Sequence, residues 1–144
     1  MYATVTDARC EPFESDAQMK KLTPVLVVDA LEPVLPFWTE RLGFEVTVTV
    51  PHEDQTGFAI LVKDQVEIMY QSRASAAADA PQVAAQVGGT GVLFIEVEDV
   101  GEVEKQLAGV PLLIPRRRTF YGMDEIYVKA PCGNVVGFAS PVEK

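Results

Sequence analysis

The sequence of 144 residues is poor in cysteine and in histidine, and it contains no long apolar run. Two cysteines, Cys10 and Cys132, are too few for the disulfide framework of a small secreted domain, so we expect free thiols in a reducing cytosol. No apolar stretch approaches the roughly 20 residues that a helix needs to cross a bilayer, which predicts no membrane partner. The N-terminus has no basic start followed by an apolar stretch, which argues against a secretory signal. A cytoplasmic location is therefore expected.

Positive charge is also scarce. Twelve Lys and Arg residues stand against 21 Asp and Glu residues, which gives a net charge of −9. Phosphate backbones are bound by clustered basic side chains, so the sequence predicts no nucleic-acid partner. The local exception is the run Arg116, Arg117 and Arg118. It has two interpretations: a solvated strand end or loop, or an anion site at the mouth of a cleft.

Apolar residues make up 48% of the chain, enough for a globular core. Residues 1–19 are polar and lack a sustained period, so we expect an N-terminal appendage that is disordered or packs on the outside. A domain is predicted over residues 20–141. It opens with an apolar, β-branched run from Leu22 to Asp29, typical of a buried strand.

A helix is predicted next, from Glu32 to Gly43. Pro33 and Pro36 are tolerated near its start, and a glycine commonly ends a helix. Its apolar stripe consists of Leu31, Val34, Leu35, Trp38 and Leu42. Three predicted strands complete the first unit: Phe44–Val50, Gly57–Lys63 and Val66–Gln71.

The same order then recurs after an Ala-rich linker, residues 73–89, in which a short helix is expected. Residues 91–97 predict a strand, and Val100, Val103 and Leu107 predict a short helix. Three strands follow, at 111–116, 124–129 and 135–139. We therefore divide the domain into unit one (22–72) and unit two (90–141), each with the order βαβββ. A repeated unit that cannot cover its own sheet predicts an α+β fold in which both units share one core.

Several short motifs resemble the glyoxalase / bleomycin-resistance / extradiol-dioxygenase superfamily, also called the vicinal oxygen chelate fold. They are the opening strand 23–29, Phe37-Trp38 with Leu42-Gly43-Phe44, the strand 66–71, and Tyr121-Gly122 to Glu125 followed by Pro131-Cys132-Gly133-Asn134. The resemblance implies two tandem βαβββ units that form an incompletely closed eight-stranded sheet around a ligand cleft, with the helices outside. It also implies a homodimer.

In metal-dependent members of that superfamily, the ligands come from the first and last strands of each unit. Those positions fall on Thr23 (or Leu22, if the alignment shifts by one residue), Glu67, Val92 and Gly137 in this sequence. A divalent metal needs three or four converging donors, and Glu67 alone is suitable. The single histidine, His52, is interpreted as a loop residue. We therefore predict no metal and no other cofactor.

Strand alternation predicts the side chains that line the cleft. Adding the hairpin tyrosine that the resemblance indicates, the expected lining is Thr23, Val25, Glu67, Met69, Phe94, Glu96, Tyr121, Glu125 and Tyr127. Carboxylates beside aromatic rings favour a cationic or amine-bearing ligand. Ordinary core packing or surface exposure would explain the same residues.

Three functions remain open from the sequence. The first is a metal-free binding protein that sequesters a drug-like or metabolite ligand in the cleft. The second is a glyoxalase- or dioxygenase-like enzyme, a lyase, isomerase or oxygenase. There Glu67 acts as the catalytic base, with a pKa raised by apolar surroundings, or as a lone retained metal ligand. The third is a structural role in which the fold pairs with another subunit. Whether any reaction is catalysed stays undecided.

Overall fold

The computed structural model describes residues 20–87 and 92–142, so the predicted appendage over residues 1–19 lies outside it. Each of the two units contributes four strands, in the order that the sequence predicts. Unit one contains β1 (Val25–Val28), β2 (Glu45–His52), β3 (Gln55–Lys63) and β4 (Val66–Ser72). Unit two contains β5 (Val92–Glu96), β6 (Leu112–Arg118), β7 (Met123–Lys129) and β8 (Val135–Pro141).

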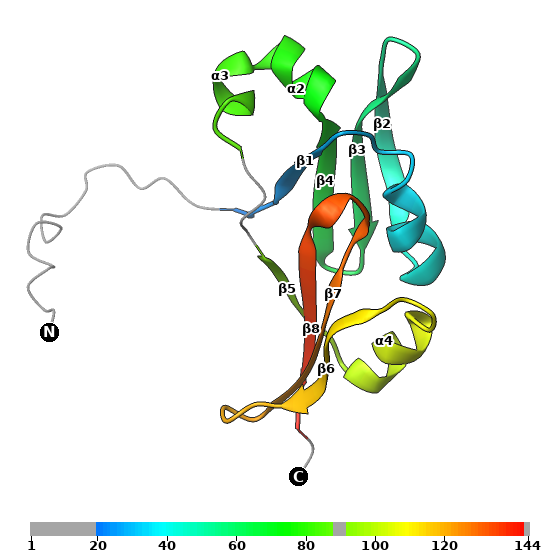
Figure 1. Cartoon of the computed structure of the whole chain (residues 1–144), viewed down its shortest axis with the longest axis vertical. Coiled ribbons are helices and arrows are strands. Elements are labelled where there is room, and N and C mark those ends of the chain that lie inside the picture. The colour runs from blue at the N-terminus through cyan, green and yellow to red at the C-terminus, as the bar shows by residue number, and fades with distance from the viewer. Residues whose placement is uncertain (1–19, 88–91, 143–144) are drawn as a thin grey trace, which may run out of the picture.

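The eight strands form two four-stranded mixed sheets, ordered β1-β4-β3-β2 and β5-β8-β7-β6. In each sheet the first strand pairs in parallel with the last, and the hairpin strands pair antiparallel. This arrangement confirms the predicted α+β fold with two like units. The sheets lie one after the other along the long axis of the molecule, with the helices η1 (cyan) and α4 beside them (Figure 1).

The first predicted helix is shorter than its apolar stripe suggested. Instead of a helix from Glu32 to Gly43, the structure has η1 (Phe37–Arg41), one turn with π-helical hydrogen bonds. Pro33 and Pro36 have no backbone N–H to donate, and residues 32–34 form turns, so helical backbone begins only at Leu35. Gly43 ends the segment with a φ of +80°, a conformation that favours glycine.

The remaining helices are short. α4 (Val100–Gln106) is the helix of unit two, and the side chain of Asp99 caps it by accepting a hydrogen bond from Gly101 N. The segment predicted as a linker contains α2 (Arg73–Asp79) and α3 (Pro81–Ala84). No helix among the described residues is long and apolar enough to span a membrane.

One face of each sheet packs against the helices and forms the core. In unit one, Ile68 and Tyr70 lie on this face and contact the layer around Trp38. In unit two, Ile126 and Val128 are fully buried on the corresponding face, and they alternate with the predicted cleft residues Glu125 and Tyr127. A single cluster of buried apolar side chains runs through both units. The other face of each sheet is left for the candidate site.

Candidate functional site

Glu67 lies on the open face of the first sheet, near the start of β4. Its Oε1 accepts a hydrogen bond from Thr23 Oγ1 at 3.0 Å and forms an ion pair with Lys21 Nζ at 2.6 Å. The parallel pairing of β1 with β4 brings the segment before β1 alongside Glu67, although the two are 44 residues apart. The structure therefore joins two predicted site residues, Thr23 and Glu67, and adds Lys21.

These contacts shift the pKa of Glu67 in the direction opposite to the one expected from the sequence. The sequence suggested apolar surroundings and a raised pKa, whereas the hydrogen bond from Lys21, followed by that from Thr23, lowers the pKa of this carboxyl below its ordinary value. A hydrogen bond or a positive charge favours the ionised form, and here both outweigh desolvation. The carboxylate of Glu67 is thus a stabilised anion and a weak base.

The other unit-one residues of the predicted lining surround Glu67. Val25 and Met69 are register partners on β1 and β4, and Ile60 of β3 continues their row. Val25 is 47% exposed, and Val48 and Val50 on β2 are similarly open. The face is a largely apolar sheet surface with one neutralised carboxylate.

The unit-two residues lie on the open face of the second sheet in two neighbouring rows. Phe94, Gly137 and Tyr127 are register partners on β5, β8 and β7, so they form one row across the sheet. Glu96, Ala139, Glu125 and Arg117 form the next row. Phe94 is 51% exposed, whereas Glu125 is completely buried.

Other side chains cover and satisfy the carboxylate of Glu125. Its Oε1 accepts from Arg117 Nη2 at 3.2 Å, and its Oε2 accepts a short hydrogen bond from the Tyr121 hydroxyl. This hydrogen bond raises the pKa of Tyr121, because the protonated phenol is the donor. The predicted pair Tyr121 and Glu125 is therefore brought together, and sequence reasoning missed Arg117 as its partner.

The three consecutive arginines lie on β6, and each forms an ion pair with an acidic side chain. Arg117 pairs with Glu125, and Arg118 pairs with Asp124 at 3.0 Å. Arg116 lies near Glu104 of α4, with 3.5 Å between Nη1 and Oε1. The run is neither a loop nor a set of unopposed positive charges, which argues against an anion site.

Gly137 lies beneath an aromatic ring. A Cβ atom at this position would approach Tyr127 Cδ2 and Cζ to 2.8 Å, closer than real side chains tolerate. The guanidinium carbon of Arg117 lies 5.8 Å from the centroid of the same ring. The Tyr127 ring thus fills the space above Gly137, the position at which the superfamily resemblance would place the last metal ligand.

The residues present do not fit a divalent metal. Val92 and Gly137 have no donor side chain, the Tyr127 ring covers Gly137, and the ammonium of Lys21 already balances the charge of Glu67. Within residues 20–87 and 92–142, no three His, Cys, Asp or Glu side chains gather as they would around a metal ion.

The two sets of predicted site residues stay on separate sheets. In the part of the chain that the structure describes, no hydrogen bond or ion pair links the set around Glu67 to the set around Glu125. Two of the three predicted carboxylates, Glu67 and Glu125, are already paired within their own unit. The electrostatic reason for expecting a cationic ligand is therefore weakened, and Glu96 is left as the exposed carboxylate of the lining.

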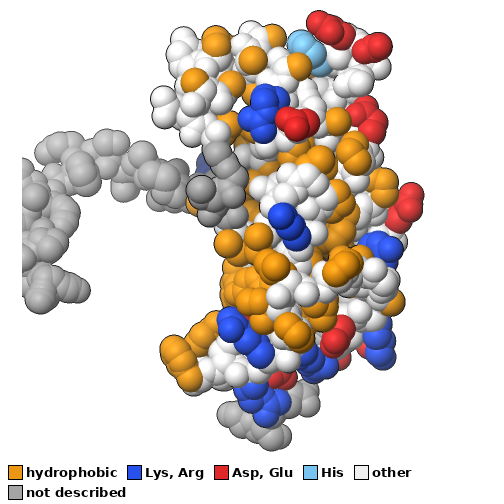
Figure 2. Space-filling model, viewed as in Figure 1, with side chains coloured by type: hydrophobic (Ala, Val, Ile, Leu, Met, Phe, Trp, Pro, Cys, Tyr) orange, Lys and Arg blue, Asp and Glu red, His pale blue; other side chains and the backbone are white. Residues whose placement is uncertain are grey.

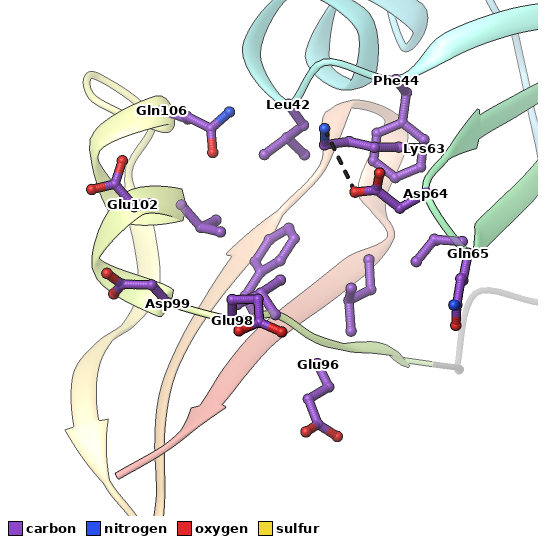
Figure 3. Close-up of a pocket in the computed structure, with 15 residues that line it drawn as sticks. Leu42, Phe44, Lys63, Asp64, Gln65, Glu96, Glu98, Asp99, Glu102 and Gln106 are labelled. Carbon is purple, nitrogen blue, oxygen red and sulfur yellow. Dashed lines mark ion pairs between the residues drawn. The ribbon is translucent and has the colours of Figure 1, made fainter. Parts of the chain in front are cut away.

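A cavity of about 660 Å³ lies elsewhere, at the seam between the units. Glu102 and Gln106 of α4 border it on one side, and Lys63 at the end of β3 borders it on the other, with Asp64 and Gln65 of the β3–β4 turn (Figure 3). Of the predicted lining, Glu96 alone borders this cavity. Its apolar walls come from core side chains that no strand pattern had marked as functional: Leu42, Phe44, Val66, Ile95, Val97, Val103 and Phe138.

The family profile for the glyoxalase / bleomycin resistance protein / dioxygenase superfamily matches residues 21–138. The chain belongs to this superfamily. The match covers both units, in agreement with the motifs on which the resemblance rested. A search of curated proteins found no match.

Solved structures of the superfamily share the fold at low sequence identity. A glyoxalase / bleomycin resistance protein / dioxygenase from Nocardioides is 20% identical over 89% of this chain and 87% of its own, with a TM-score of 0.70. Lactoylglutathione lyase from Agrobacterium tumefaciens is 16% identical over 87% and 96%, with a TM-score of 0.70. The bleomycin-binding protein from Streptomyces verticillus, in complex with copper(II)-bleomycin, is 20% identical over 90% and 100%, with a TM-score of 0.60.

Proposed function

We propose that this superfamily member is a metal-free protein that binds a small organic molecule on the open faces of its sheets and releases it unchanged. One observation carries the proposal: the Tyr127 ring lies above Gly137, where a last metal ligand would be needed. The Lys21–Glu67 ion pair supports it, because an internal ammonium compensates the one carboxylate among the four candidate positions. The similar bleomycin-binding protein is a superfamily member that binds a drug molecule.

The exposed apolar side chains support a binding role as well. Val25, Val92 and Phe94 are each about half exposed on the open faces. Hydrophobic side chains also gather on the surface near the middle of the molecule, where the two units meet (Figure 2). Contiguous exposed apolar surface marks binding grooves or interfaces. We propose a homodimer whose cleft combines the open face of unit one from one subunit with that of unit two from its partner.

The competing enzymatic hypothesis depends on Glu67 as a base. Its lowered pKa argues against this role, because general bases work best with a pKa near the working pH. Tyr121 is a hydroxyl with a raised pKa, and Glu125 already accepts its proton in a hydrogen bond. Neither residue is poised to remove a proton from a substrate.

Two measurements test the proposal directly. Elemental analysis of protein purified without chelators should find no stoichiometric Ni, Zn, Mn or Fe. A thermal-shift screen of cationic antibiotics and planar aromatic compounds should identify ligands that raise the Tm, and mass spectrometry should recover them unchanged. A stoichiometric metal would overturn the metal-free account. Turnover that is lost in Glu67→Gln would favour the enzyme.

The homodimer has its own test. Sedimentation equilibrium of the full chain should give twice the mass of one subunit. Val92→Asp and Phe94→Asp place charges on the open face of unit two, and they should shift the equilibrium toward monomer. Val83→Asp, at an exposed position on α3, is the matched control and should leave the mass unchanged. A monomer at all protein concentrations would exclude a cleft shared between subunits.

A further inference from the structure

We infer that the row Phe94, Gly137 and Tyr127, together with Arg117, is a platform for a planar, uncharged aromatic group. This inference rests on the proposed binding function and names the class of ligand that the open face of unit two selects. The row crosses three adjacent strands, β5, β8 and β7, through direct register pairs. It is therefore held by backbone hydrogen bonds and not by a loop.

Gly137 makes the platform possible. Because it has no Cβ atom, the Tyr127 ring lies down over the backbone of β8 instead of standing away from the sheet. Phe94 is paired with Gly137 on the opposite side from Tyr127 and is half exposed. The Tyr127 ring, which lies against the sheet, and the half-exposed Phe94 ring thus flank Gly137.

Arg117 adds the third component. Its guanidinium carbon lies 5.8 Å from the centroid of Tyr127, and its Nε and Nη2 are both directed at Glu125 Oε1. Glu125 fixes the guanidinium plane and balances its charge. A neutral, electron-rich ring can stack on such a plane by a cation–π contact, without a charged ligand group having to displace Glu125.

The mutual pairing of Arg117 and Glu125 favours an uncharged ligand at this row. Glu125 is paired with Arg117 and with Tyr121, so a ligand cation gains little from it. A ligand anion near Arg117 would meet the carboxylate that already occupies that side chain. What remains for recognition is ring area, to which offset stacking or edge contacts contribute beyond simple burial.

The test compares 2-naphthol, which is planar and neutral at physiological pH, with its saturated analogue decahydro-2-naphthol. Isothermal titration of the full chain should show that 2-naphthol binds about fivefold more tightly or better, which corresponds to the usual gain from aromatic contacts. General hydrophobic binding would give no preference, or would favour the saturated compound.

Substitutions test whether the preference for 2-naphthol arises at this platform. Gly137→Ala, Tyr127→Leu and Phe94→Leu should each reduce the ratio of the two affinities toward one. Tyr127→Phe retains the ring and should keep the ratio, as should Val83→Ala on distant α3. Tyr127→Leu and Phe94→Leu keep the test decisive if Gly137→Ala does not fold, and circular dichroism of each variant checks this.

The outcomes separate this inference from the proposed function. If both compounds bind equally and the three variants change nothing, the platform is wrong while small-molecule binding stands. If neither compound binds, and the wider screen produces no ligand, the binding function fails first. A preference for 2-naphthol that survives in all three variants places ring recognition elsewhere and overturns the inference.

Discussion

The indole Nε1–H of Trp38 donates a hydrogen bond of 3.0 Å to the hydroxyl oxygen of Tyr70, and both side chains are completely buried. Trp38 also makes edge-on contacts with Phe37 and Phe44, whose ring centroids lie 5.2 and 5.0 Å away. A buried N–H without an acceptor is costly. We therefore expect Tyr70→Phe to lower the free energy of unfolding by about 1–3 kcal/mol in urea titrations. Tyr127→Phe, a similar change at a half-buried tyrosine, is the control and should cost less.

The same pair predicts how stability depends on alkaline pH. Burial is the largest cause that raises the pKa of Tyr70, from 10.0 to about 12. Because the folded pKa is the higher one, its stabilising effect is complete below pH 10 and is lost as pH rises toward 12. Across this range, the free energy of unfolding of the wild-type protein should fall by about 2 kcal/mol more than that of Tyr70→Phe. Urea titrations at several pH values measure both, and parallel curves of unfolding free energy against pH would contradict the assignment.

The ion pair at Glu67 predicts a titration at acid pH. Lys21→Gln removes the largest cause of the lowered pKa, so the pKa of Glu67 should rise toward its ordinary value of 4.5. A folded pKa below the unfolded value stabilises the protein above about pH 4.5, and the effect disappears as pH falls through the folded value. Carboxyl NMR titration measures the shift. Lys20→Gln, one residue away, should leave the titration of Glu67 unchanged.

The close approach of Tyr127 to Gly137 predicts a coupled pair. Gly137→Ala forces a Cβ atom into the ring, and overpacking of this kind costs about 1–3 kcal/mol. In a Tyr127→Ala background the same change should cost much less, because the obstructing ring is gone. A double-mutant cycle in urea gives the coupling directly. Additive effects would mean that the ring moves away freely.

Arg117 and Arg118 offer a matched comparison of buried and accessible ion pairs. Arg117 faces the fully buried Glu125, whereas the Asp124 side chain that faces Arg118 is 14% exposed. Removal of one partner from a buried carboxylate leaves an uncompensated charge. Arg117→Leu should thus destabilise the fold by about 2 kcal/mol more than Arg118→Leu in thermal or urea unfolding. Equal losses would show that Tyr121 alone satisfies Glu125.

The order of the strands and the duplication could be predicted from sequence because both depend on local period. Apolar runs and alternating apolar residues marked the strands, and Ile126 and Val128 lie in the core, opposite the predicted cleft residues Glu125 and Tyr127. The predicted helix was too long, since its apolar stripe gave no sign that residues 32–34 form turns. A local sequence pattern predicts the type of an element better than it predicts the hydrogen-bond geometry of that element.

The site was less predictable because its partners are distant in sequence or act through shape. Lys21 was assigned to the start of the domain, and only the pairing of β1 with β4 places it against Glu67. Gly137 was recognised as a position without a ligand side chain. That the Tyr127 ring occupies this space follows from the β7–β8 register and from how the ring lies.

The buried apolar cluster extends from Val28 and Trp38 of unit one to Val100 and Phe138 of unit two without a break. Cutting the chain between the halves would expose that surface to water on both fragments. Duplication in this fold has therefore produced interdependent halves and not two autonomous modules. A chain of half the length would leave this apolar surface open to water, and pairing of two identical copies would cover it again.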